Sequence, residues 1–267
     1  MNILNYNSEN PFFKTDLTLA NKIKKDLDEI GYVIIKNFNI NTSNIEGCRS
    51  RFIELSKFIG KPIGHDINNK IVWDIKSNTS SENFIKTYSE HSHEAELHTD
   101  SQYSEYPEDY FGLLTLRKAT CGGGLSYIIT LDSILYELSL LSSGVEIKRI
   151  LSETKYPFIV PNVFKKVNTK EPEFNFGPIL RENEIRFRID TFEKAIEYDS
   201  NLCTEEQLHA YKEFKKIVLN SLLVKEFYLE EKDLIFINNK TTLHGRSSFT
   251  DKNRHLLRIR MNKFSLA

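Results

Sequence analysis

The sequence predicts an α+β fold, mainly β, in which a jelly-roll barrel (a double-stranded β-helix of the cupin type) is flanked by helices. Two observations predict this class. Helical patterns of apolar residues fill most of the first sixty positions, whereas short apolar segments separated by turns follow from Tyr110 onward. The chain has 267 residues, no internal repeat and no Pro-, Gly- or Ser-rich linker, so residues 1–267 are expected to form a single domain.

The amino-terminal part is expected to contain two helices and one buried strand. Asp16–Ile30 carries apolar residues at roughly helical spacing, and Gly31 is placed to end that helix in a left-handed conformation. The apolar, β-branched segment Tyr32–Phe38 is typical of a buried strand. A second helix is predicted over Ser43–Ile59, where it meets Gly60.

The rest of the chain is expected to be mostly strands. Asp66–Glu90 is polar with little periodicity, and we expect it to contain a mobile loop. A glycine turn is predicted at Gly122–Gly124, and one long helix from Thr204, its N-cap, to about Leu222. The strand candidates are Tyr110–Arg117, Leu125–Leu131, Ile185–Ile189, Glu226–Leu229, Leu234–Asn238 and Leu256–Lys263.

Composition excludes several classes of function. With 36 Lys and Arg against 37 Asp and Glu, the formal charge of −1 provides no general attraction for nucleic acid. No apolar stretch approaches the roughly 20 residues of a membrane span, and the amino terminus lacks the features of a secretion signal. Three widely spaced cysteines indicate neither a disulfide framework nor a zinc site. We therefore expect a cytoplasmic protein whose partner is a small molecule, with its oligomeric state left open.

The first chemical pattern is His98-Thr99-Asp100. In an extended segment, residues two apart project to the same side, so an imidazole and a carboxylate would lie together as candidate metal ligands. The second pattern is the segment Asp233–Arg246, a predicted buried strand followed by a polar turn that presents His244. Two histidines and one carboxylate form the facial triad that suits ferrous iron and leaves open positions for a cosubstrate and dioxygen.

The third pattern lies in the last predicted strand. Apolar residues there alternate with Arg258, Arg260 and Asn262, so one face is apolar and the other cationic. A guanidinium on the inner face of a barrel is costly to desolvate unless it meets an anion, and its planar fork suits a carboxylate. A carboxylate-bearing ligand is therefore expected near the metal.

These patterns, in this order, resemble the taurine dioxygenase and clavaminate synthase branch of the Fe(II)/2-oxoglutarate-dependent oxygenases. That family has HxD or HxE, then a GGxT turn that opens a strand, then a distal His, and an Arg about fourteen residues later. The corresponding residues here are His98 and Asp100, Gly123-Gly124-Leu-Ser126, His244, and Arg258. The segment GYVIIKNF, which begins at Gly31, is similar as well, and the resemblance extends from about residue 17 to 263.

The resemblance implies a role for each matching residue. His98, Asp100 and His244 would bind Fe(II), and Arg258 would hold the distal carboxylate of 2-oxoglutarate. Ser126 would add a hydrogen bond, since it keeps the hydroxyl of the usual Thr. Arg254 either supports the same carboxylate or only its loop, and its position before the strand predicts that it is solvated.

Three further residues are candidates for substrate binding. In an extended run Glu94 and Glu96 would face the same way as His98 and Asp100, where they could meet a substrate ammonium; the alternative is that this segment forms a loop. Arg260 is either a rim charge or a ligand of the substrate or cosubstrate.

The function that follows is hydroxylation of an unactivated C–H bond in a small, amino-acid-like substrate, with O2 and 2-oxoglutarate consumed and succinate and CO2 released. The presence of Asp100 favours hydroxylation over halogenation, because related halogenases lack this carboxylate; desaturation and cyclisation remain open. One alternative is a non-catalytic jelly-roll protein that binds a small carboxylate. The other is a metal-dependent isomerase or hydrolase on a similar barrel.

Overall fold

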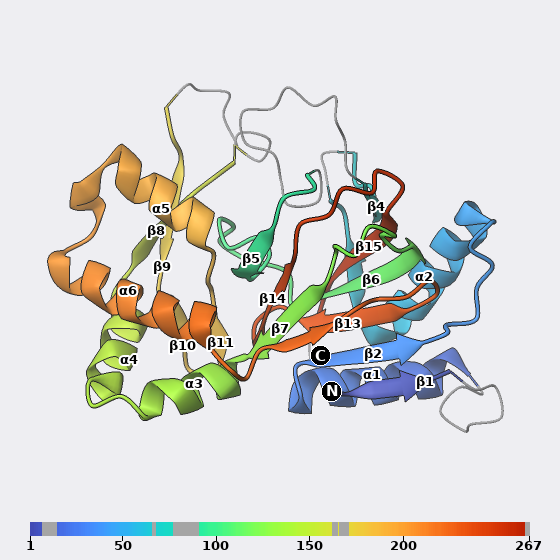
Figure 1. The fold of residues 1–267 in the computed structure, drawn as a ribbon, viewed down its shortest axis with the longest axis horizontal. Coiled ribbons are helices and arrows are strands. Elements are labelled where there is room, and N and C mark those ends of the chain that lie inside the picture. The colour runs from blue at the N-terminus through green and yellow to red at the C-terminus, as the bar shows by residue number, and fades with distance from the viewer. Residues whose placement is uncertain (7–14, 66–67, 77–90, 162–164, 166–170, 265–267) are drawn as a thin grey trace.

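The computed structural model describes residues 1–6, 15–65, 68–76, 91–161, 165 and 171–264, and over this part of the chain it has an α+β architecture (Figure 1). Two main sheets occupy the middle, helices α3 to α6 gather at one end, and α1 and α2 lie against the larger sheet. The helices are α1 (Asp16–Glu29), α2 (Ile45–Ile59), α3 (Leu131–Ser139), α4 (Gly144–Glu153), α5 (Ile189–Tyr198) and α6 (Glu205–Asn220), with a short 3-10 turn at Ser200–Leu202.

The larger sheet has the strand order β1-β2-β13-β6-β15-β3, with β4 also paired to β15. Helices α1 and α2 cover one of its faces, and their apolar residues form a core with the strand residues beneath them. The strands are β1 (Ile3–Asn5), β2 (Tyr32–Lys36), β3 (Lys61–Ile63), β4 (Val72–Ile75), β6 (Tyr110–Arg117), β13 (Leu234–Asn238) and β15 (His255–Asn262).

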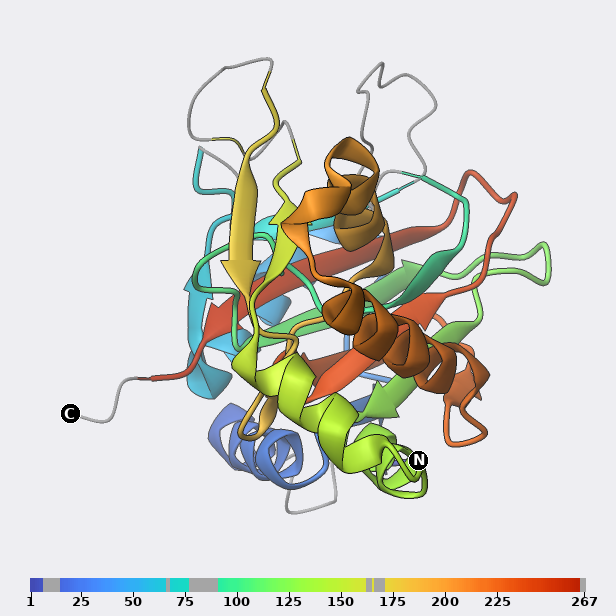
Figure 2. The same cartoon turned by 90° about the vertical axis from the view of Figure 1, so that its left-hand side faces the viewer.

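The smaller sheet has the order β12-β7-β14-β5. Helices α3 to α6 lie on its side of the molecule (Figure 2), and their apolar residues form a second core with Ile129 and Leu243 of this sheet. A third core joins Ile128 and Phe227 of the smaller sheet to residues of the larger one, including Phe111, so the two sheets pack against each other. The strands are β5 (Ala95–His98), β7 (Ser126–Thr130), β12 (Lys225–Phe227) and β14 (Thr242–Arg246).

Two short ribbons complete the described part of the chain. Strand β8 (Tyr156–Ile159) pairs with β9 (Phe174–Gly177), and β10 (Leu180–Arg181) pairs with β11 (Glu184–Ile185). The α+β class predicted from the sequence is confirmed. Within the described residues, however, the hydrogen-bonded strand pairs form separate sheets and do not close into a barrel.

Several local predictions are confirmed. Gly31 has φ +89°, a left-handed conformation that glycine adopts without steric cost, and it follows the end of α1. Thr204 caps α6 through a capping box with Gln207, which satisfies backbone N–H groups of the first turn. The turn at Gly122–Gly124 is present, with φ +80° at Gly122 and at Gly124.

Other local predictions differ from the structure. Of the predicted strand Ile185–Ile189, only Ile185 is in a strand, as the last residue of β11, and Ile189 begins α5, whose buried side packs into the helical core. Helices α3 and α4 were not expected, since short apolar runs do not distinguish a helix from a strand. Most of the loop expected over 66–90 lies outside the described residues, and β4 occupies the part at Val72–Ile75.

Candidate active site

The smaller sheet brings three predicted ligands together. His98 is the last residue of β5, and Asp100 follows two positions later, beyond the strand. His244 lies in the middle of β14, which follows the turn at 239–241 as the sequence predicted, and it is directly opposite His98 in the antiparallel pairing. The two imidazole rings are therefore cross-strand neighbours, with their centroids 4.2 Å apart.

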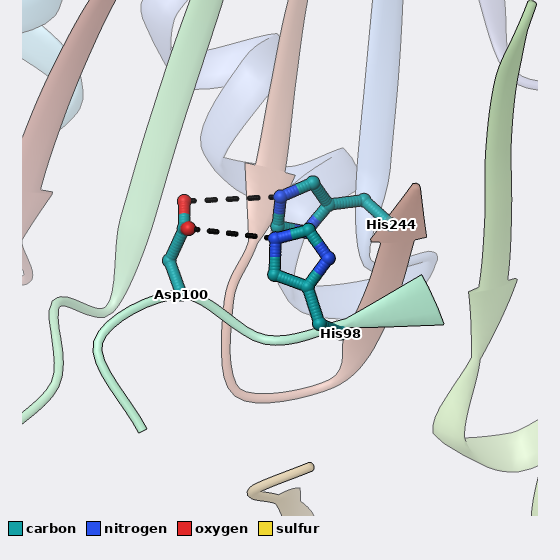
Figure 3. A group of neighbouring side chains, drawn as sticks. All are labelled: His98, Asp100 and His244. Carbon is teal, nitrogen blue, oxygen red and sulfur yellow. Dashed lines mark ion pairs between the residues drawn. The ribbon is translucent and has the colours of Figure 1, made fainter. Parts of the chain in front are cut away.

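The three side chains converge on one point, as Figure 3 shows. His98 Nε2 lies 3.7 Å from Asp100 Oδ1, and His244 Nε2 lies 3.8 Å from Asp100 Oδ2. Two atoms that each bind one ion at about 2.1 Å can be at most about 4.2 Å apart, so a single metal ion can bridge each of these pairs. Within the described residues, these three form the one group of His, Cys, Asp and Glu side chains that could hold a metal ion.

The surroundings set the protonation that a metal ligand requires. Burial lowers the pKa of His244 well below its ordinary value, so this imidazole is neutral. Burial acts to raise the pKa of Asp100, but Arg258 and the histidines outweigh it and hold this pKa well below its ordinary value, so the carboxylate is ionised. His98 Nδ1 lies 2.7 Å from the carbonyl oxygen of Glu96; donation there leaves Nε2 free to bind a metal.

The triad opens into a cavity of about 80 Å³ between the sheets. Its wall is largely apolar, with Phe111, Leu113, Leu229 and Leu256 among the lining residues. Three other predicted residues line the same cavity, namely Ser126, Arg254 and Arg258. The structure thus places the three residues predicted to bind the cosubstrate in the cavity that the triad also lines.

The two arginines have different surroundings. Arg258 Nη2 lies 2.9 Å from Asp100 Oδ2 and 3.3 Å from Glu108 Oε1, so its guanidinium already meets two carboxylates. Arg254 is only 7% exposed, and its buried Nη1 has no hydrogen-bond partner among the described residues. The prediction that Arg254 is solvated is wrong, because its side chain packs over Phe249 and inward beside the turn at Gly124. Burial lowers the pKa of Arg254 to about 9, which leaves it charged at neutral pH.

The three candidate substrate residues lie apart from this cavity. Arg260 donates from Nε to His65 Nδ1 at 2.9 Å and from Nη1 to the hydroxyl of Ser101 at 3.2 Å. Glu94 is exposed and Glu96 half-buried, and the cavity is lined by Ala95 instead. An irregularity in the pairing of β14 with β5 interrupts the strict alternation that would have placed both glutamates beside His98.

Sequence reasoning missed four residues that surround the site. Glu108, 2% exposed, lies between Arg258 and Arg260. Asn239 is hydrogen-bonded to the backbone of Asp100, and His65 to Arg260. Arg246 lines the cavity and donates to the carbonyl of His91 at 3.1 Å and to that of His93. The alternation of arginines on the last strand predicted a carboxylate-bearing ligand, and no local pattern indicated that the carboxylate of Glu108 lies beside two of them.

Two histidines and an ionised aspartate in an arginine-lined cavity define a metal-dependent oxygenase of the 2-oxoglutarate class. Residues 10–260 match the family described as taurine catabolism dioxygenase TauD, TfdA family. The chain belongs to this family, which confirms the resemblance inferred from the order of the motifs, and it is a dioxygenase.

Solved structures share the fold at low sequence identity. The oxygenase OrfP in complex with Fe, succinate and (3R,4R)-dihydroxy-L-Arg has a TM-score of 0.70 at 20% identity, covering 93% of this chain and 81% of that one. An asparagine oxygenase in complex with Fe(II), 2S,3S-3-hydroxyasparagine and succinate has a TM-score of 0.70 at 15% identity, covering 98% and 94%. OrfP with Fe and alpha-ketoglutaric acid has a TM-score of 0.67 at 20% identity, covering 94% and 80%.

Two comparisons return nothing further. No curated protein matches the chain significantly. Among the described residues, no helix is long and apolar enough to cross a membrane.

Proposed function

We propose that this protein is an Fe(II)/2-oxoglutarate-dependent dioxygenase that hydroxylates a C–H bond of a small, amino-acid-like substrate. The observation that carries the proposal is the buried triad of His98, Asp100 and His244 in one cavity with Arg254, whose buried Nη1 has no partner. Three protein ligands leave coordination positions open, as oxygen chemistry requires. An unpaired buried guanidinium requires an anion.

The triad fits ferrous iron by its chemistry. Two imidazoles and one ionised carboxylate are the donor set of the facial triad. Bound iron with 2-oxoglutarate would supply the oxidising power for C–H hydroxylation, with succinate and CO2 as coproducts. The residues of the chain would bind and orient the metal and the cosubstrate. The carbonyl of Glu96 fixes the ring of His98, and the apolar cavity wall excludes water.

The distal carboxylate of 2-oxoglutarate is assigned to Arg254 together with Ser126. Both line the metal cavity, and Arg254 also lines a small cavity behind it that contains no triad residue, so it lies at the end remote from the metal. An elongated dicarboxylate with one end at the metal would place its other end there. Arg258 was the first candidate from the sequence, but its contacts with Asp100 and Glu108 place it at the metal end.

Arg258 is assigned to a carboxylate that approaches the metal end of the cavity, that of the substrate. Its Nε is buried without a partner, so the guanidinium retains a donor although Asp100 and Glu108 lie beside it. The complexes of the neighbouring structures support the amino-acid class, because OrfP is bound to hydroxylated arginine and the asparagine oxygenase to 3-hydroxyasparagine. Glu96 and Arg260 remain candidates for indirect roles, Glu96 through its carbonyl on His98 and Arg260 through His65.

We also propose that residues 1–267 are one catalytic domain whose two sheets are the halves of a jelly roll. The apolar residues that join β6, β13 and β15 to β7 and β12 support this arrangement. We expect the enzyme to be cytoplasmic and to act without nucleic acid.

The test is succinate release from the purified protein supplied with Fe(II), 2-oxoglutarate, air and a panel of free amino acids. Substrate-dependent succinate formation that stops under strict anoxia supports the proposal. Turnover that persists without oxygen would show a metal-dependent isomerase or hydrolase. If 2-oxoglutarate binds but no amino acid of the panel leads to succinate release, the non-catalytic carboxylate-binding protein is favoured.

A further inference from the structure

The loop that follows β5 and leads into β6, residues 99–109, carries the metal-binding Asp100 near its start and Glu108 near its end. Its start is held by the backbone bond from Thr99 N to the carbonyl of Phe187, at 2.8 Å. Ser101 has φ +53°, a left-handed conformation that is uncommon for a residue with a side chain. Such a conformation persists only where neighbouring contacts determine it.

Asn239, the residue directly after β13, contacts both ends of this loop with one side chain. Its Oδ1 accepts the backbone N–H of Asp100 at 2.8 Å, and its Nδ2 donates to the carbonyl of Asp100 at 3.1 Å. The same Nδ2 donates to the carbonyl of Glu108 at 3.0 Å. The backbone N–H of Asn239 adds a bond to the carbonyl of Asp109 at 2.8 Å.

We propose that Asn239 is the positioning residue of the metal centre, which fixes the backbone on both sides of Asp100 and ties it to Glu108. The side chain of Asn239 bonds to both the N–H and the C=O of Asp100. These two bonds constrain both backbone dihedrals of Asp100, and hence the direction of its carboxylate. The third bond sets where Glu108 meets Arg258. Asn239 is 1% exposed, so removing its side chain would leave buried backbone groups of both loop ends without this partner.

The neighbouring residue provides a matched control. Asn238 is also a buried asparagine, 3% exposed, whose Nδ2 donates to the carbonyl of Leu27 at 3.1 Å and whose Oδ1 accepts from Lys240 N at 3.0 Å. Its bonds hold α1 and the turn after β13, and they do not reach the loop of Asp100. Truncating either asparagine removes a buried amide of the same size, so the two variants should lose similar stability.

The inference rests on the proposed metal site, and its test is metal affinity without turnover. Mn(II) binding to the full-length protein is measured by isothermal titration calorimetry, with the melting temperature of each variant recorded in parallel. We expect Asn239→Ala to weaken Mn(II) binding by about 10- to 100-fold, the usual effect of removing a group that orients a metal ligand. Asn238→Ala should change it by less than about 3-fold at a comparable melting temperature.

Two results would overturn the inference: Mn(II) affinity of Asn239→Ala equal to that of the wild type, or equal weakening by Asn238→Ala. If Asn239→Ala does not accumulate as folded protein, Asn239→Ser decides, because one hydroxyl cannot bond to both ends of the loop and should still weaken binding about 10-fold. Wild-type protein that binds no Mn(II) would instead contradict the metal site of the proposed function.

Discussion

The guanidinium of Arg258 and the carboxylate of Asp100 lie in direct contact, with Nη2 2.9 Å from Oδ2. This ion pair joins the metal site to the cationic face of β15, and Glu108 completes it at 3.3 Å from the same nitrogen. Arg258 therefore helps to keep Asp100 ionised, because burial alone would act to raise its pKa. The same contact explains why Arg258 is a weaker candidate than Arg254 for the far end of the cosubstrate.

Asp100→Ala is expected to abolish succinate release and to remove most of the Mn(II) affinity, because one of three metal ligands is lost. Calorimetric titration with Mn(II) and a succinate assay measure the two effects. Asp109→Ala is the control, since this nearby acid accepts a hydrogen bond from Lys263 N and does not line the cavity. Normal turnover by Asp100→Ala would mean that Asp100 is not a metal ligand.

Arg254→Ala is expected to raise the dissociation constant of 2-oxoglutarate by about 30-fold to several thousand-fold, because truncating one partner of a buried charge pair typically costs ~2–5 kcal/mol. The measurement is an anaerobic titration of the visible charge-transfer band of the iron complex. Arg254→Lys should recover only part of the affinity, since an ammonium cannot reproduce the planar fork.

Arg258→Ala is the matched comparison in the same titration. Arg258→Ala should raise the dissociation constant of 2-oxoglutarate less than Arg254→Ala does. It should also weaken Mn(II) binding, because Asp100 loses its ion-pair partner. The reverse ranking for 2-oxoglutarate would restore Arg258 as the residue that binds the distal carboxylate.

His65 should make stability depend on pH. Burial, with Arg258 and Arg260 nearby, lowers its pKa to about 2, whereas an unfolded histidine has a pKa of about 6.5. Between these values the unfolded state binds more protons, so the free energy of unfolding falls as pH drops below about 6.5, by up to ~1.4 kcal/mol per pH unit. Urea unfolding of the wild type and of His65→Gln from pH 5 to 7.5 should show a smaller decline for the variant; equal slopes would contradict this assignment.

Gly112→Ala should destabilise the fold by about 1–3 kcal/mol through overpacking. A Cβ at this position in β6 would lie 2.7 Å from the ring of Phe236 and 3.0 Å from that of Phe52, both fully buried. The measurement is the urea midpoint, with an unchanged slope. A midpoint equal to that of the wild type would show that the two rings move at no cost.

Features that depend on neighbouring residues could be predicted from the sequence. The periodic helix Asp16–Glu29 with Gly31, the capped helix that starts after Thr204, and the strands of the last third of the chain follow from local patterns. The triad was also accessible, because the spacing of His98 and Asp100, with His244 fourteen residues before Arg258, matches a known order of motifs. Helices α3 and α5 could not be predicted from the sequence. Packing against the helical core, and not a local pattern, decides there between helix and strand.

By itself, therefore, the sequence determined the α+β class, the family and the three side chains that the structure brings together as a candidate metal site, because each depends on residue types at short or ordered spacing. Only the tertiary structure decided that Arg254 has a buried nitrogen with no hydrogen-bond partner among the described residues, and that Arg258 meets Glu108. These contacts depend on strands that are far apart in the chain. Arg258 is 150 residues from Glu108 along the chain. Asn239 is 139 residues from Asp100. Such contacts leave no periodicity in the sequence, since packing of β6, β13 and β15 side by side creates them.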